Sequence, residues 1–167
     1  MDSNQLRAMQ APLKAQYRES PERALVTLRA RGRSNEGISC RVETGKALVV
    51  AGLHPATGGI GDTACSGDML LEALVACAGV TLNAVATALG IGLRDATIEA
   101  EGDLDFRGTL GVSKEVPVGF QKIRLIVTLD TAASEDQLTN LLRLTERYCV
   151  VLQTLKHAPE VTLHRKI

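Results

Sequence analysis

The sequence predicts a single domain of the α+β class, in which short antiparallel strands and separate helices share one core. Three features carry this prediction. Segments of alternating apolar and polar residues lie before residue 53 and again after residue 93, a long apolar run covers residues 70–90, and a helix-capping signature begins at Ser134. Because strands repeat every two residues and helices every 3.6, these patterns distinguish the two kinds of element. We divide the chain into an N-terminal helical extension, residues 1–22, and the α+β domain, residues 23–167.

The first part of the domain predicts an antiparallel meander. Apolar side chains alternate or cluster, as is typical of short strands, in three segments: residues 24–31, 38–43 and 47–52. The Gly- and Asn-containing stretch 32–37 is predicted to be a turn between the first two strands. The Gly- and Thr-rich stretch 54–67 is predicted to be a long loop, and ordered loops of this length are often functional.

Residues 70–90 predict a helix that begins after a cap at Ser66 and ends at Gly90. Its apolar residues occupy every face, so it must be covered on all sides. A chain of 167 residues can barely surround such a helix, so we expect a homodimer with this helix at its centre. The run approaches membrane-spanning length, but polar residues such as Glu72 and Asn83 interrupt it. We therefore predict a buried helix and no membrane association.

The second half of the chain predicts two more strands, over residues 94–107 and 121–130. The second strand has one apolar face, which consists of Ile123, Leu125, Val127 and Leu129. This pattern predicts a sheet that is covered on one side only.

Helices are predicted next. Ser134 and Gln137 have the spacing of a capping box for a helix that runs to about residue 148. We expect a short second helix to follow, and a closing strand over residues 160–167.

Composition excludes several classes of function. The chain has 19 basic residues (Lys and Arg) and 19 acidic residues (Asp and Glu), so its formal net charge is zero. A nucleic-acid partner is therefore not expected. Aromatic residues make up only 2%, which also argues against stacking platforms for bases. The four cysteines form no CxxC pattern and no His stands at ligand spacing to them, so we expect neither a metal nor another cofactor. The first residues lack a secretory pattern, and we expect a cytoplasmic protein with reduced thiols.

Two cysteines have contexts that suggest chemistry. Cys77 lies in the middle of the apolar helix, and Cys149 lies at the junction of the two C-terminal helices. A free cysteine is commonly a small core residue, so a chemical role needs a second group beside the sulfur. A helix N-terminus near a sulfur lowers the pKa of the thiol, and Cys149 stands at such a place.

The other two cysteines carry weaker signals. Cys65, in the Gly-rich loop, is either an alternative resolving thiol or a loop residue without a role, whereas Cys40 in a strand is expected to pack. His54, in the same loop as Cys65, is expected to be a surface residue.

The contexts of the two cysteines resemble the two cysteine motifs of the OsmC/Ohr family of peroxidases. The central helix "SGDMLLEALVAC" is similar to the family's P-x-x-L-L-x-A-L-x-x-C, and "CVV" stands where the family has C-P-V. Between them, "EGDLDFRG" and "GFQKI" resemble the recurring G-x-L-D-x-R-G and G-F-x-x-I. The resemblance covers about Gly32 to Ile167. The chain is similar to the generic OsmC-like branch rather than to the organic hydroperoxide resistance branch, because Val150 replaces the proline.

The resemblance implies a fold and an activity. The implied fold is an intertwined α+β homodimer in which antiparallel sheets wrap around long central apolar helices. The implied activity is reduction of organic hydroperoxides, in which Cys77 attacks the O–O bond and Cys149 forms a disulfide with it. A dithiol reductant, lipoyl-type or a small thiol, then restores both thiols.

The resemblance also implies a cation beside the reactive sulfur, held by an acidic residue. Arg33 is the closest match to the family's arginine, with Arg29 and Arg31 as rivals on the same strand face. Asp68, nine residues before Cys77, is the candidate acidic partner, although the hydroperoxide branch has its acid one position earlier, at Gly67 here. For all four the alternative is an ordinary role: surface charge for the arginines, and a first-turn partner of the helix dipole for Asp68.

Two alternatives to a peroxidase stay open at this point. One is a binding protein on the same scaffold that holds a small hydrophobic ligand, with cysteines that merely pack. The other is a structural α+β dimer without a small-molecule role.

Overall fold

A computed structural model of the chain describes residues 31–35, 39–43, 48–111 and 113–166, together with residues 2–5, 8, 11 and 19. Of residues 31–35, 39–43, 48 and 107, the backbone alone is described. The predicted strand at 24–31 lies outside these residues, apart from its last residue. The described positions 3–5, 8, 11 and 19 are helical, and the division at residue 22 stays a prediction.

The first sheet has four strands in the order β1-β2-β3-β4: β1 (Arg31–Asn35), β2 (Ser39–Glu43), β3 (Leu48–Gly52) and β4 (Ala64–Cys65). The first three are antiparallel, which confirms the predicted meander of β2 and β3. The turn predicted at 32–37 is wrong for residues 32–35, which belong to β1 and pair with β2, whereas residues 36 and 37 lie outside the described residues. Pairing between strands has overridden the local turn preference of the Gly- and Asn-containing segment.

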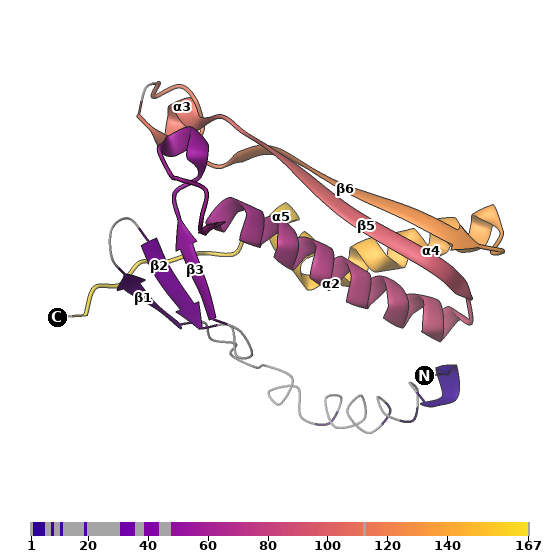
Figure 1. The fold of residues 1–167 in the computed structure, drawn as a ribbon. Helices are drawn as coiled ribbons and strands as arrows, with labels where there is room; N and C mark the ends of the chain where they lie inside the picture. The colour runs from indigo at the N-terminus through magenta and orange to yellow at the C-terminus, as the bar shows by residue number, and fades with distance from the viewer. Residues whose placement is uncertain are drawn as a thin grey trace.

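Two long strands, β5 (Leu93–Leu104) and β6 (Phe120–Thr131), form a second antiparallel sheet that projects away from the first (Figure 1). They confirm the predicted strands, except that β5 stops at Leu104. A short helix, α3 (Phe106–Thr109), occupies the connection between the two strands. Half-buried and exposed residues alternate along most of β6, as predicted, and the apolar residues of its half-buried face pack on the core.

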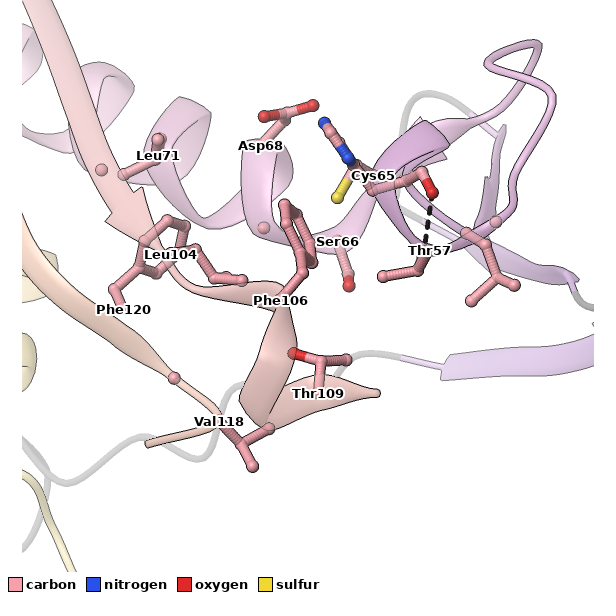
Figure 2. A pocket seen from close by; sticks show the side chains of 16 residues that line it. Thr57, Cys65, Ser66, Asp68, Leu71, Leu104, Phe106, Thr109, Val118 and Phe120 are labelled. Atoms are coloured by element: carbon pink, nitrogen blue, oxygen red, sulfur yellow. Dashed lines mark hydrogen bonds between the residues drawn. The ribbon is translucent and has the colours of Figure 1, made fainter. Parts of the chain in front are cut away.

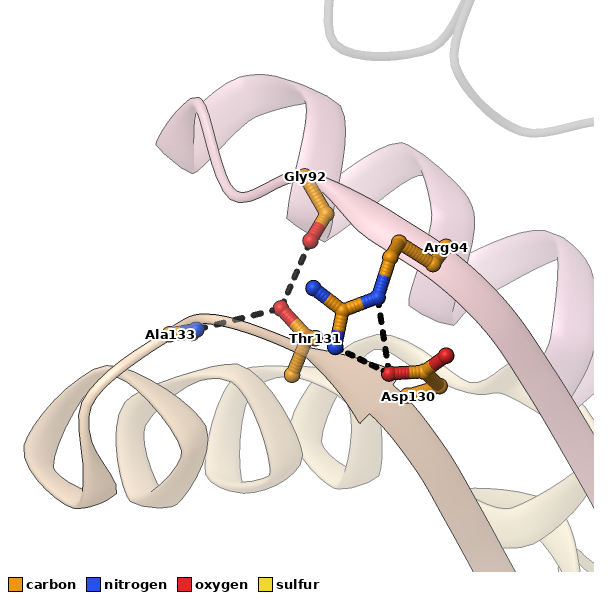
Figure 3. Close-up of polar contacts among 5 residues, drawn as sticks. All are labelled: Gly92, Arg94, Asp130, Thr131 and Ala133. Carbon is orange, nitrogen blue, oxygen red and sulfur yellow. Dashed lines mark hydrogen bonds and ion pairs between the residues drawn. The ribbon is translucent and has the colours of Figure 1, made fainter.

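Polar contacts tie the end of β6 to the start of β5 and to the segment that leads into the next helix (Figure 3). The Thr131 hydroxyl donates a hydrogen bond to the carbonyl oxygen of Gly92 (2.6 Å) and accepts one from the backbone N–H of Ala133 (3.2 Å). Arg94 Nε donates to Asp130 Oδ1 at 2.8 Å across the two strands. These contacts set the direction in which the chain leaves β6.

The apolar run forms helix α2 (Ser66–Leu89), which ends as predicted at Gly90 in the left-handed conformation, with φ of 70°. The predicted cap at Ser66 is wrong. The N-cap residue is Cys65, which makes no side-chain capping hydrogen bond. Cys65 pairs with Gly52 in the parallel β3–β4 ladder, so the backbone is extended at Cys65 and the helix begins at Ser66, one residue earlier than a Ser66 cap requires.

Two further helices follow β6: α4 (Glu135–Tyr148) and α5 (Val150–Lys156). The predicted capping box is present. The Ser134 hydroxyl accepts from the backbone N–H of Gln137 at 3.3 Å, and Gln137 Oε1 accepts from the N–H of Ser134 at 2.9 Å. The short second helix after residue 148 is thus also confirmed.

The core consists of two clusters strung along α2, both covered by the β5–β6 sheet. In the first, Leu82 and Ala86 pack against Leu141 of α4. In the second, Leu74 and Ala78 pack against Cys149 and the half-buried apolar residues of α5. The two C-terminal helices therefore cover successive lengths of the same central helix.

Within this chain α2 is buried along one stripe rather than on all sides. Leu74, Ala78, Leu82 and Ala86 are its buried residues, whereas Val80 is 73% exposed. By length and composition α2 could cross a membrane, but core helices of soluble proteins have the same composition, so this is weak evidence.

The structure differs from prediction at two other segments. The predicted loop 54–67 contains a short 3-10 helix, η2 (Pro55–Thr57), and the strand β4. The predicted closing strand is wrong for the described residues 160–166, which have no strand assignment. Val161 and Leu163 in this segment are exposed and the backbone has no sheet partner among the described residues, so alternation alone did not make a strand.

Candidate thiol site

The structure brings Cys77 and Cys149 together. Cys77 lies at the middle of α2 and packs against the second core cluster. Cys149 is the single residue between α4 and α5. Its backbone is extended (φ −71°, ψ 105°), and it is both the C-cap of α4 and the N-cap of α5. The Cys149 thiol is fully buried and donates a hydrogen bond to the Cys77 sulfur. Cys77 is half-buried, so the pair has one enclosed thiol and one thiol near the surface.

Local geometry at the α4–α5 junction explains this contact. The N–H of Cys149 donates to the carbonyl of Thr145 at 3.0 Å, which closes α4. The chain then turns into α5, whose first backbone N–H groups, those of Val150 and Val151, have no partner within their own helix. Both groups lie close enough to the sulfur of Cys77 to lower the pKa of its thiol.

The two thiols have opposite pKa shifts. Burial raises the pKa of Cys77, but hydrogen bonds from the backbone of Val151, the Cys149 thiol, the backbone of Val150 and the Thr81 hydroxyl together lower it below that of a free thiol. For Cys149, burial is the largest cause and raises the pKa. Its hydrogen bond to Cys77 and the negative charge that forms there raise it further. Cys77 is therefore the member of the pair that ionises first.

Asp68 lies away from this pair within the chain. It is nine residues before Cys77, which is two and a half turns of helix, so the two side chains leave α2 on opposite sides. Asp68 lines a separate cavity at the start of α2 (Figure 2).

The predicted arginines are described in part. Arg31 and Arg33 lie in β1, where the structure describes the backbone alone, and Arg29 lies outside the described residues. The roles of the arginines and of Asp68 stay predictions.

The other candidates from the sequence do not join the thiol pair. Cys65 is twelve residues before Cys77, about 18 Å along the helix, so it cannot resolve Cys77 in this conformation. His54 stacks on Phe106 with ring centroids 4.9 Å apart. Cys65 and His54 both line the same cavity as Asp68. Among the described residues, no group of three or more His, Cys, Asp or Glu gathers in a way that could hold a metal ion.

Sequence reasoning missed two contributors to the site. Thr81 lies one helical turn after Cys77, and that spacing on a helix was a usable signal for a neighbouring hydroxyl. The backbone N–H groups of Val150 and Val151 carry no side-chain signal at all. Only the helix junction at Cys149 pointed to them.

We predict that the donor at position 149 controls the pKa of Cys77. Cys149→Ala removes a hydrogen bond that lowers this pKa, so less thiolate is present and alkylation of Cys77 at pH 7 should be slower than in wild type. Cys149→Ser keeps a hydroxyl donor and should alkylate faster than the alanine variant. The pH dependence of iodoacetamide labelling, followed on the Cys77 peptide by mass spectrometry, measures both midpoints. Equal midpoints for the two variants would contradict the assigned hydrogen bond.

Comparisons with known proteins agree with this architecture. The family model described as OsmC-like protein matches residues 59–164, which is more than half of the chain. A search of curated proteins gives no sequence match.

Several solved structures share the fold. An OsmC like protein from Mycoplasma pneumoniae superposes with a TM-score of 0.67 at 19% identity, over 80% of this chain and 89% of that one. An organic hydroperoxide resistance protein from Elizabethkingia anophelis has a TM-score of 0.64 at 16% identity, over 80% and 91%. An organic hydroperoxide resistance protein OsmC from Legionella pneumophila has 0.62 at 17%, over 80% and 91%. At these identities the likeness establishes the fold alone.

Proposed function

The chain belongs to the family of OsmC-like proteins, and from this premise we propose that it is a thiol peroxidase that reduces organic hydroperoxides with Cys77 and Cys149. The observation that carries the proposal is the thiol pair with opposed pKa shifts, in which Cys77 ionises first and Cys149 stays protonated. This asymmetry suits a nucleophile and a resolving thiol, respectively. Two of the three structural neighbours described above are named as organic hydroperoxide resistance proteins, which agrees with this choice of substrate.

The reaction follows from the two protonation states. The Cys77 thiolate attacks the terminal oxygen of the hydroperoxide ROOH, the O–O bond breaks, and Cys77 becomes a sulfenic acid. The alkoxide leaves and takes a proton to give the alcohol ROH. The Cys149 sulfur then attacks the Cys77 sulfur, and the sulfenic hydroxyl leaves as water. In total, ROOH and two thiols give ROH, water and one disulfide.

A dithiol closes the cycle by thiol–disulfide exchange, in which it is oxidised and both cysteines are reduced. We propose a lipoyl-type or small dithiol as this reductant. Arg33 is proposed as the cation that stabilises the thiolate, with Asp68 to hold it. Because Asp68 and Cys77 leave α2 on opposite sides, Asp68 can take this role only from a second copy of the chain.

A homodimer is part of the proposal. In the single chain, Val80 and Leu70 of α2 remain exposed next to several alanines, and a second copy would cover this apolar side. We expect the full chain at micromolar concentration to sediment with twice the mass of the monomer. A monomer mass across that range would contradict the dimer and the role proposed for Asp68, but not the thiol chemistry.

The proposed function is tested by counting thiols. One equivalent of cumene hydroperoxide added to the reduced protein should remove two free thiols per chain, measured with Ellman's reagent. Peptide mapping without reduction should then find the Cys77 and Cys149 peptides joined. If both peptides keep free thiols in excess hydroperoxide, the chain is not a peroxidase of this kind.

A further inference from the structure

The turn between α4 and α5 consists of a single residue, Cys149, and the thiol pair depends on the direction that α5 takes from it. One residue contributes only two soft backbone dihedrals, φ and ψ, and a small change in either one swings the whole of α5. With seven residues, α5 is too short to be a stable helix on its own. Contacts beyond its own backbone must therefore hold it against the end of α4.

Gln153 makes hydrogen bonds to both sides of this turn. Its backbone N–H donates to the carbonyl oxygen of Cys149 at 2.9 Å, which closes the first turn of α5. Its side-chain Nε2 donates to the carbonyl oxygen of Glu146, in the last turn of α4, at 2.7 Å. The two bonds together join the helices across the residue that separates them.

The side-chain bond takes the place of a helical one. In a continuous helix the Glu146 carbonyl would accept from the N–H of Val150, four residues further on. The chain leaves the helix at Cys149, and the side-chain amide of Gln153 donates to that carbonyl instead. The N–H of Val150 is thus released from α4, and it lies close enough to the sulfur of Cys77 to lower the pKa of that thiol.

Packing and charge hold α5 less specifically. Apolar residues of α5 pack on the core cluster that contains Cys149, but apolar burial is non-directional and does not select one donor for one carbonyl. Lys156 forms an ion pair with the side chain of Glu146, and both side chains are about half exposed. Exposed pairs of this kind contribute little and are screened by salt. Gln153 is therefore the directional link between the two helices.

We propose that Gln153 is a positioning residue for the thiol pair. By donating to the Glu146 carbonyl it fixes the turn at Cys149, so that this thiol and the N–H of the next residue both face Cys77. Gln153 acts through the backbone of α4 and not through the reacting sulfurs. The proposal deepens the proposed function and rests on it, because the thiol pair is the site that the peroxidase chemistry uses.

The first test removes the donor. Gln153→Met keeps the length of the side chain but cannot donate, so the turn at Cys149 should loosen and the Cys77 thiolate should lose part of its hydrogen bonding. We expect the pH midpoint of iodoacetamide labelling of Cys77, followed by mass spectrometry on its peptide, to rise by about one pH unit. Thr154→Met, the same side chain introduced at the exposed neighbouring position, should leave the midpoint at the wild-type value. A bond that only stabilises the fold would not move this midpoint, so equal midpoints in the two variants would overturn the proposal.

Gln153→Arg is the rescue variant. The arginine Nε–H stands at the same place along the side chain as Nε2 of glutamine and can donate to the Glu146 carbonyl. Positive charge near a thiol also lowers its pKa, so Thr154→Arg measures the effect of charge alone. We expect the midpoint to differ more between Gln153→Arg and Gln153→Met than between Thr154→Arg and Thr154→Met. Equal differences at the two positions would mean that charge and not the hydrogen bond moves the midpoint, and would overturn the proposal.

A measurement on the wild-type protein serves if Gln153→Met does not fold, which circular dichroism reports. In isotope-labelled protein, the NMR signals of the Gln153 side-chain amide should move with pH at the midpoint found for Cys77. Those of Gln137, at the other end of α4, should not move at that midpoint. A Gln153 amide that stays constant while Cys77 ionises would overturn the proposal. None of these readouts uses a peroxide, so failure of the positioning role and failure of the peroxidase are distinguishable.

Discussion

Replacement of Cys77 by serine is expected to lower the rate of hydroperoxide reduction at least about 100-fold, to the level of the uncatalysed reaction with the reductant. The serine hydroxyl is not ionised at neutral pH and cannot be oxidised to a sulfenic acid, so both the nucleophile and the oxidised intermediate are lost. Consumption of cumene hydroperoxide with dihydrolipoamide as the reductant measures the effect. If the Cys77→Ser protein keeps a tenth of the wild-type rate, another thiol must react with the hydroperoxide.

Cys149→Ser is the matched control for this result. It keeps a hydrogen-bond donor beside Cys77, so the first attack on the hydroperoxide should persist and one thiol should be lost per chain. Without a resolving sulfur, the sulfenic acid of Cys77 should accumulate and be captured by dimedone. Dimedone capture at Cys77 in this variant, and none in Cys77→Ser, is the expected pattern. If Cys149→Ser turns over at the wild-type rate with no captured adduct, Cys149 is not the resolving thiol.

Leu141→Ala is expected to cost about 3 kcal/mol of unfolding free energy, within the usual range of about 2–5 kcal/mol for a buried leucine. Leu141 is fully buried where α4 meets Leu82 and Ala86 of α2, and its loss leaves a cavity in the first core cluster. Leu142, its neighbour on α4, is 40% exposed and supplies the control. Leu142→Ala should cost less than about 1 kcal/mol, because part of that side chain is already in water.

Urea unfolding followed by circular dichroism measures both variants. Equal losses for the two leucines would mean that another surface, such as a second copy of the chain, buries Leu142 as deeply as Leu141. Repeating the measurement at tenfold lower protein concentration separates these cases, because stability that depends on association falls with dilution.

Local patterns predicted most of the elements. Alternation gave the bounds of β2, β3 and β6 to within a residue or two, and the Ser134–Gln137 spacing located the start of α4. These signals are local, since a strand or a cap is encoded by residues a few positions apart. The failures have one cause in common. The strand β1, the cap at Cys65 and the absence of a closing strand were each decided by whether a distant backbone segment was present to pair with.

The thiol site was predictable only in part. The sequence by itself determined that Cys77 lies in an apolar helix, and that Cys149 lies at a helix junction further along the chain. Only the tertiary structure decided that the junction lies against the middle of α2, where the N–H groups of Val150 and Val151 lower the pKa of Cys77.

The same division holds for the cavity beside Cys65, whose walls come from segments as far apart as Gly52 and Phe120. The physical reason is that periodicity encodes which face of an element is apolar. Which faces meet depends on packing between elements that are remote in sequence, and a single sequence carries no direct record of it.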